Sequence, residues 1–265
     1  MKSIDLLNIG IYSSSTFGNY ESEYIEVLER AVTRGFVLPS VNVQVIQNEV
    51  IKQLKDSGIY VKLDVLFLFT GSNVDFAMIN MIKPTHEALS QPGAVGYSYT
   101  QGIITDTLNS LDVNELLNNS INYAVGNQSM FCWKASSTVS FFTGLKGVTL
   151  DSKNFIRDNR GILSCNTEVF YSASTTNGLV HLDRYSGLYK GIMNGVEYES
   201  ISLTGGDPLP ALPIYLGAYN NNGGITSRNN TEIPVFGYGA SLAEDKTILY
   251  NIINNYNTAI GTITV

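Results

Sequence analysis

Two acidic side chains lie at a spacing that could do chemistry. Glu197 and Glu199 alternate along a predicted strand, so we expect both to point to the same side. Retaining glycoside hydrolysis needs two carboxyl groups about 5 Å apart on one surface, and an acidic triplet on one strand often supplies them. The sequence contains no Glu-x-Asp-x-x-Glu run. Because two neighbouring acids on a strand are more often a solvated face, we assign no catalytic residue and expect no enzyme.

Histidine and cysteine side chains are few and isolated. Neither His86 nor His181 has a carboxylate or a cysteine at a spacing typical of a metal site or a catalytic triad. Cys132 and Cys165 also lack a metal-ligand spacing, and both fall in strand-like runs that suit a buried free thiol, with a disulfide as the alternative. The sequence contains no phosphate-binding Gly-x-x-x-x-Gly-Lys motif and no serine elbow. We therefore predict neither a metal site nor a cofactor.

An asparagine-rich stretch supplies groups that bind saccharides. Its candidate ligand-binding residues combine amides, an aromatic ring and a guanidinium: Tyr219, Asn220, Asn221, Asn222, Arg228 and Asn229. Loops held by a rigid sandwich often carry recognition. The competing interpretation is that Asn and Gly serve turns with positive φ. A third possibility is that Asp183 and this loop hold Ca²⁺ through their oxygen atoms.

Composition narrows the class of protein. Hydrophobic residues make up 44% of the 265 positions, enough to bury a core. With 15% charged residues and a net charge of -7, we expect no attraction to nucleic acid or to anionic membranes. The abundance of Gly, Tyr, Asn, Ser and Thr is typical of antiparallel sandwiches whose surfaces suit neutral glycans or protein partners. No apolar run reaches the length of a membrane span and no secretory leader is evident, so we expect no membrane insertion.

The first 88 residues are predicted to form an arm and a helical region. Residues 1–20 begin with an apolar run and continue with Ser and Thr, which favours an arm for anchoring or assembly. Residues 21–88 carry helical spacing, with one helix ending at Gly35 and another running from Ser40 to Gly58. The alternation at 41–45 also fits a strand, and the apolar run 63–69 fits either a buried helix or a buried strand. A short helix is predicted before Pro84.

The apolar stripes of the two helices could pack within the chain or against an identical neighbour. The candidate assembly residues are Tyr24, Val27, Leu28, Val43 and Ile46. Helices that precede a sandwich often make an oligomer, and closed cyclic symmetry is the usual result. We expect a homotrimer or a homodimer.

Residues 89–265 are predicted to form one antiparallel β-sandwich. Short β-prone runs separated by Gly, Asn and Ser recur from residue 95 to 239, with one of them at 121–125. The Asn194-Gly195 pair between two such runs predicts a hairpin over 187–203. Ser241 and Glu244 form a capping-box pattern, which predicts a C-terminal helix over 241–260 that packs onto the sandwich.

The order of these elements resembles the concanavalin A-like (laminin-G-like) module of phage and prophage structural proteins. The segments that match are 183–186, 188–189, the Asn-Gly turn at 194–195, 214–218, the Asn-rich loop 219–223, the Phe-Gly strand 236–239 and the capped helix 241–250. Earlier segments resemble the lead-in of Bacteroidetes-phage proteins of this type: 51–55, 58–59, 62–64, 75–77, 79–80 and Pro84. The stretch 95–175 departs most from the pattern.

This resemblance implies a virion protein, such as a head fibre, a capsid decoration or a tail-associated protein. Its sandwich would face outward for adhesion to a host-surface glycan or receptor, and its other partners would be capsid or fibre components. We expect it in the virion, without nucleic acid as a ligand. Two alternatives belong to other classes: a polysaccharide depolymerase that uses Glu197 or Glu199, and a free lectin.

Overall fold

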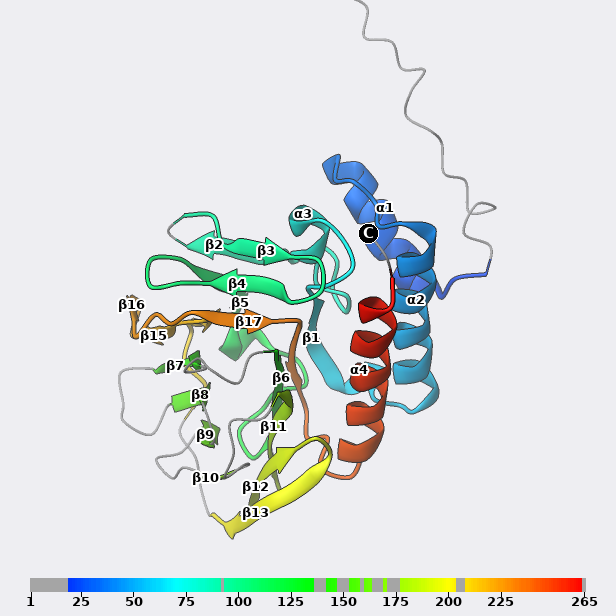
Figure 1. Cartoon of the computed structure of the whole chain (residues 1–265). Coiled ribbons are helices and arrows are strands. Elements are labelled where there is room, and N and C mark those ends of the chain that lie inside the picture. The colour runs from blue at the N-terminus through cyan, green and yellow to red at the C-terminus, as the bar shows by residue number, and fades with distance from the viewer. Residues whose placement is uncertain are drawn as a thin grey trace, which may run out of the picture.

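The computed structural model of the chain describes residues 19–91, 93–135, 142–146, 153–157, 160–163, 169–170, 177–203 and 208–263. Strands are its most abundant regular elements, and helices precede and follow them (Figure 1). The α-helices and 3-10 turns are α1 (Ser22–Arg34), α2 (Val41–Asp56), η2 (Tyr60–Lys62), α3 (Val74–Ala77), η3 (Leu117–Asn119) and α4 (Lys246–Gly261).

Two larger sheets contain most of the described strands. The six-stranded sheet has the spatial order β1 (Leu63–Leu68), β18 (Val235–Gly239), β6 (Asn127–Lys134), β11 (Gly178–Tyr185), β12 (Leu188–Met193) and β13 (Val196–Ser202). The nine-stranded sheet follows the order β10 (Val169–Phe170), β9 (Arg160–Leu163), β8 (Lys153–Arg157), β7 (Phe142–Lys146), β14 (Pro213–Leu216), β5 (Ser110–Leu116) and β2 (Leu89–Gln91), with β15 (Tyr219–Asn221) and β16 (Gly224–Thr226) beside β7.

A smaller sheet completes the β structure. Its strands are β17 (Thr231–Ile233), β4 (Gly102–Thr105) and β3 (Gly96–Ser98). Every described strand pairing is antiparallel except that of β15 with β7. The predicted fold class, a concanavalin A-like antiparallel β-sandwich with N-terminal helices and a C-terminal helix, is confirmed.

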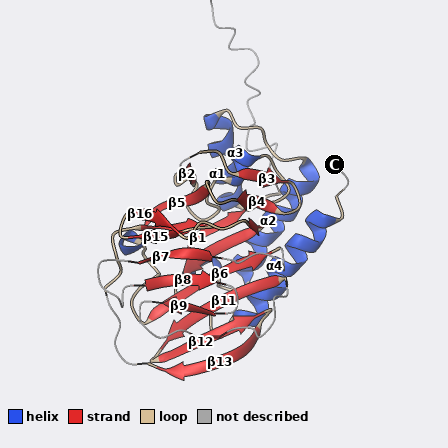
Figure 2. Ribbon diagram, turned by 60° about the vertical axis from the view of Figure 1, so that its left-hand side comes forward, coloured by secondary structure: helices blue, strands red, loops and turns tan. Residues whose placement is uncertain are grey.

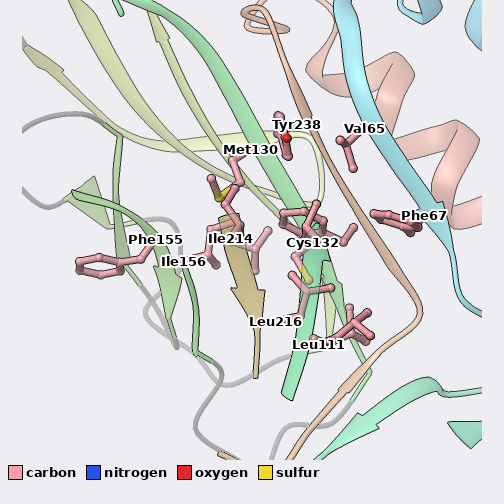
Figure 3. Close-up of a cluster of buried hydrophobic side chains, with 14 of the residues drawn as sticks. Val65, Phe67, Leu111, Met130, Cys132, Phe155, Ile156, Ile214, Leu216 and Tyr238 are labelled. Atoms are coloured by element: carbon pink, nitrogen blue, oxygen red, sulfur yellow. The ribbon is translucent and has the colours of Figure 1, made fainter. Parts of the chain in front are cut away.

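Three layers enclose two hydrophobic clusters. The first cluster lies between the sheets, where side chains of β1, β6 and β18 meet those of β5, β8 and β14 (Figure 3). The second lies between the outer face of the six-stranded sheet and the helices, which gather on one side of the strands (Figure 2). Strands β1, β18, β6 and β11 of the six-stranded sheet are therefore buried along most of both faces, which fits their apolar residues, whereas the edge strand β13 is largely exposed.

Strand β1 shows why the predicted boundary between residues 88 and 89 does not separate two units. Its side chains alternate, so Val65 and Phe67 enter the cluster between the sheets while Leu66 and Leu68 enter the cluster under the helices. This double burial explains the unbroken apolar run. Because β1 pairs with β18, the predicted helical region 21–88 contributes a strand to the sandwich.

The helical stripes pack within the chain. Helices α1 and α2 occupy the predicted positions, and Gly35 ends α1 in the left-handed conformation. Four of the five candidate assembly residues, Tyr24, Val27, Leu28 and Val43, are completely buried in the cluster under the helices. In this fold they cannot form a contact with a second copy. Ile46, the fifth, is half-buried at the surface between α2 and α4.

The hairpin over 187–203 is confirmed. Strands β12 and β13 pair antiparallel, and Asn194 and Gly195 between them have φ values of 52° and 76°. Positive φ at both central residues is the requirement of a type I′ turn, and the Asn-Gly pair meets it at little steric cost.

The capping box predicted at Ser241 was wrong. Helix α4 begins at Lys246, and residues 243–245 form a turn before it. The Ser241 hydroxyl donates instead to the buried carboxylate of Asp183, at 2.7 Å. The Ser241 side chain therefore donates to an acceptor from a distant segment and does not cap the helix.

Two further predicted elements differ from the structure. The strand predicted at 121–125 is a turn, because the Asp64 carboxylate accepts hydrogen bonds from the backbone N–H groups of Ile121, Asn122 and Tyr123. The short helix predicted before Pro84 is limited to α3.

Candidate functional site

The asparagine-rich stretch forms a hairpin at the edge of the nine-stranded sheet. Strands β15 and β16 pair around a turn in which Asn222 has a φ of 51°. The Asn220 side-chain amide is buried, and both its nitrogen and its oxygen form hydrogen bonds with the backbone. Its Nδ2 donates to the carbonyl of Pro213 and its Oδ1 accepts from the N–H of Gly223, both at 2.8 Å. Asn220 therefore braces the turn.

The aromatic ring of the hairpin also faces inward. The Tyr219 ring packs edge-on against Phe155, with ring centroids 6.0 Å apart, and burial raises the pKa of its hydroxyl. Asn221 and Asn222 are exposed. The hairpin thus exposes two amides, while its tyrosine ring is partly buried and packs against the core.

Arg228 and Asn229 join the hairpin to neighbouring loops. The Asn229 backbone N–H donates to Gly217 at 2.9 Å, and its carbonyl accepts from the Thr105 hydroxyl at 2.8 Å. Backbone N–H groups of Leu108 and Asn109 and the Asn109 amide lower the pKa of Asp106, with a smaller contribution from the half-buried Arg228. These contacts stabilise the loop framework.

The acidic pair on β13 does not face one side of the sheet. Glu199 lies opposite Gly191 and Glu197 lies opposite Ile192, with a bulge between them. Because Gly191 and Ile192 are consecutive, their side chains and those of their partners point to opposite faces. Glu197 also forms an ion pair with Lys190, at 3.1 Å. Two carboxylates on opposite faces cannot flank one glycosidic bond, so the same-side prediction was wrong.

The calcium hypothesis finds no shared site. Asp183 lies in the six-stranded sheet, whereas Asn220 belongs to a hairpin of the nine-stranded sheet. Among the described residues, no group of three His, Cys, Asp or Glu side chains is placed to hold a metal. Cys132 is a free thiol whose pKa is raised by complete burial, and Cys165 lies outside the described residues.

A hollow that the sequence did not predict lies where the six-stranded sheet meets the start of α4. It has a volume of about 320 Å³, close to the lower limit for small-molecule pockets. We call it the Tyr185 hollow. It is lined by Lys62, Asn127, Tyr185, Ala240, Ser241, Ala243, Glu244 and Asp245.

The floor of the Tyr185 hollow is held by a buried carboxylate. Asp183 is completely buried, and its two oxygens accept from the Ser241 hydroxyl at 2.7 Å and from the Leu242 N–H at 2.6 Å. His181 lies 3.5 Å from the same carboxylate and 2.8 Å from the Ser129 hydroxyl. This network ties the 241–245 turn to β11, so the lining residues are held on a rigid frame.

Most side chains that line the hollow are either exposed to solvent or only partly paired within the protein. The Tyr185 side chain extends from the end of β11 and is 56% exposed, and Glu244 is exposed beside it. Lys62 pairs with Asp245 at 2.6 Å. The Asn127 carboxamide oxygen accepts from the Ser241 N–H at 3.0 Å, and no described residue accepts a hydrogen bond from its amide nitrogen. An aromatic ring therefore lies beside carboxylate, ammonium and amide groups.

Sequence reasoning missed this site because its residues come from four separated segments. A weak signal existed, since the resemblance to phage proteins included 183–186 and 241–250. A tyrosine directly before a Ser-Gly turn is placed at a strand end, where it is easily exposed.

No protein-family model matches the chain, and no curated protein does. Among solved structures, it is similar to a structure of botulinum neurotoxin type C whose cell entry is dependent upon interaction with two ganglioside molecules (15% identity, 74% of this chain, 52% of that chain, TM-score 0.49). It is also similar to domain 4 of AbnA, an arabinanase from Geobacillus stearothermophilus, in complex with arabinotriose (13%, 71%, 98%, 0.47).

A third similar structure is the NanB sialidase from Streptococcus pneumoniae, at 15% identity over 50% of this chain, with a TM-score of 0.37. The chain spans 26% of the sialidase chain and 52% of the neurotoxin chain. At such low identities and TM-scores, these likenesses assign no ligand. None of the helices within the described ranges is long and apolar enough to cross a membrane.

Proposed function

We propose that this chain is a phage-type virion protein whose β-sandwich binds neutral saccharides at the Tyr185 hollow. The observation that carries the binding proposal is the hollow itself, which places an exposed aromatic ring beside polar groups on a rigid frame. Recognition of this kind needs a concave surface with a few convergent polar groups.

The chemistry of the hollow suits a sugar ring. The face of Tyr185 can cover the apolar C–H face of a pyranose, while its hydroxyl group stays in contact with water. Tyrosine suits such surfaces because its ring is apolar and its hydroxyl is polar. Glu244 and Asp245 line the hollow with acceptors for sugar hydroxyl groups, while Lys62 and the Asn127 amide line it with donors. One ammonium against two carboxylates leaves the hollow negatively charged, and the chain carries a net charge of -7. Neutral saccharides are therefore favoured over acidic ones.

The virion proposal is supported by the sequence resemblance. Two of the segments that resemble phage structural proteins, 183–186 and 241–250, supply residues that line the hollow. In this proposal the protein is a head fibre, a capsid decoration or a tail-associated component, and the sandwich faces the host. It contacts capsid or fibre proteins and forms a homotrimer or a homodimer.

The binding proposal is tested with purified protein on an array of neutral and acidic oligosaccharides, followed by calorimetry on the best neutral ligand. Tyr185→Ala is expected to weaken binding about tenfold, which corresponds to about 1.4 kcal/mol. Tyr198→Ala is the matched control, because Tyr198 is 57% exposed on β13 and lies outside the hollow. Equal affinities of the two variants, or binding confined to acidic sugars, would contradict the proposed site.

The location is tested separately. Mass spectrometry of purified particles of the source virus is expected to detect this polypeptide at a stoichiometry set by particle symmetry. Particles that lack it would rule out the virion proposal and favour the free lectin.

A further inference from the structure

An apolar groove runs between α2 and α4, away from the Tyr185 hollow. The two helices lie side by side and antiparallel (Figure 1). The groove has a volume of about 260 Å³ and is lined by Val45, Ile46, Glu49, Val50, Gln53, Ile252, Asn255, Tyr256 and Ala259. Most of this lining is aliphatic or aromatic. Such a surface gains free energy when apolar side chains cover it.

Exposed apolar side chains extend the groove along both helices. Val45 is 52% exposed in the groove, and Val41 lies one helical turn before it with 68% exposure. Ile248 on α4 is 45% exposed and lies one turn before Ile252. Contiguous exposed apolar residues of this kind mark an interaction surface.

The chain enters its first helix on the far side of α2 from this groove. The Glu21 N–H donates to the Asn48 side chain on α2 at 2.7 Å, and the Glu21 carboxylate pairs with Lys55 on the same helix at 2.6 Å. Asn48 lies three residues after Val45 in α2. The polypeptide before residue 19 therefore starts within one helix diameter, about 10–12 Å, of the groove.

The sequence before that point contains matching apolar residues. Ile4, Leu6, Leu7, Ile9 and Ile11 lie within eight positions, and residues 12–18 connect them to the described chain. Seven residues span up to about 25 Å when extended. This reach exceeds the width of α2, so the connection is long enough.

We infer that residues 4–11 dock in the groove between α2 and α4 of their own chain. A short tether gives the segment an effective concentration in the millimolar range, which a second copy in dilute solution does not reach. Docking would cover Val45 and the groove with side chains of similar chemistry. The inference does not depend on saccharide binding, since the two surfaces share no residue.

The test measures how accessible the groove is in the full chain. Val45→Cys places a small apolar thiol in the groove, and its alkylation by iodoacetamide is followed by mass spectrometry of the peptide that contains position 45. A second protein adds Leu6→Asp and Leu7→Asp, which would prevent docking. Alkylation is expected to be about tenfold slower with the native segment, the factor for about 1.4 kcal/mol of docking free energy.

Ile121→Cys is the matched control, because Ile121 is 85% exposed and lies outside the groove. Its alkylation rate is expected to be the same with and without the two aspartates. Equal rates at position 45 with and without the aspartates would overturn the inference. Protection that weakens on dilution, together with a dimer in sedimentation, would also overturn it, because the segment would then come from a second copy.

Discussion

The asparagine-rich 219–229 segment, with its β15–β16 hairpin, and the Tyr185 hollow contain the same kinds of side chain but use them differently. Each has a tyrosine, an asparagine and a charged residue. In the hairpin, the Asn220 amide forms hydrogen bonds with Pro213 and Gly223, and the Tyr219 ring packs against Phe155. In the hollow, the Tyr185 side chain is more than half exposed, and Glu244 is exposed.

The difference shows that residue type alone does not identify a binding surface. Buried polar groups must find hydrogen-bond partners, and a group that has found them inside the protein has little left for a ligand. Beside the hollow, the buried Asp183 carboxylate accepts hydrogen bonds from the Leu242 N–H and the Ser241 hydroxyl. The side chains around it are then left to face solvent.

The largest effect is expected from the carboxylate beneath the hollow. Asp183→Ala leaves the Ser241 hydroxyl and the Leu242 N–H without their acceptor, so we expect the free energy of unfolding to fall by about 3 kcal/mol. Urea denaturation measures this change. Asp75→Ala, at an exposed position on α3, is the control and should stay within about 0.5 kcal/mol of the native protein. A small change in the free energy of unfolding of Asp183→Ala would mean that Asp183 does not hold the 241–245 turn in place.

The next effect tests whether the hairpin amide is structural. Asn220→Ala removes two buried hydrogen bonds and should cost about 2 kcal/mol of unfolding free energy, without changing saccharide affinity. Denaturant titration and calorimetry on the same sample separate the two quantities. Asn221→Ala, at an exposed neighbour, should change stability by less than about 0.5 kcal/mol. Loss of saccharide binding in folded Asn220→Ala would indicate that the ligand binds at the hairpin.

A smaller effect is expected when the charge of the hollow is changed. Glu244→Lys removes an exposed carboxylate and adds an ammonium, which should raise the affinity for acidic saccharides about threefold at low salt. The gain should disappear as ionic strength rises, because exposed charges are screened. Glu26→Lys, at an exposed position on α1, makes the same change in net charge and should leave affinity unaltered. Equal gains in both variants would assign the effect to net charge.

The smallest effect concerns pH and the loop that contacts the hairpin. Backbone and side-chain hydrogen bonds from Leu108 and Asn109 lower the pKa of Asp106 below its ordinary 3.8. Because the folded-state pKa lies below the unfolded-state pKa, the ionised carboxylate stabilises the fold at pH values above the unfolded-state pKa. This stability is lost as the pH falls through the folded-state pKa. Thermal melts below pH 3.8 should therefore show a steeper loss in the native protein than in Asp106→Asn. Parallel curves would show that Asp106 contributes nothing measurable.

Local sequence patterns predicted the elements that local interactions stabilise. The stripe from Tyr24 to Ala31 predicted α1, and Gly35 predicted its end. Asn194-Gly195 predicted the hairpin, since its turn depends on two residues. Leu63 to Phe69 could not be assigned in this way, because a run that is buried on both faces has no amphipathic period.

The candidate site was harder to predict. The same-side expectation for Glu197 and Glu199 failed because a bulge depends on strand register, which alternation along one strand does not reveal. The Ser241 capping box failed because Asp183, 58 residues away in sequence, binds the hydroxyl. Contacts between distant segments decided both outcomes.

Patterns within the sequence were enough to predict the sandwich class, the two N-terminal helices and the Asn-Gly hairpin. These follow from periodicity and turn chemistry, which act over a few residues. The tertiary structure alone decided that β1 completes the six-stranded sheet and that Lys62, Asn127, Tyr185 and Glu244 share one hollow. The physical reason is that such a site depends on which polar groups are left unpaired after distant segments have packed and formed their hydrogen bonds.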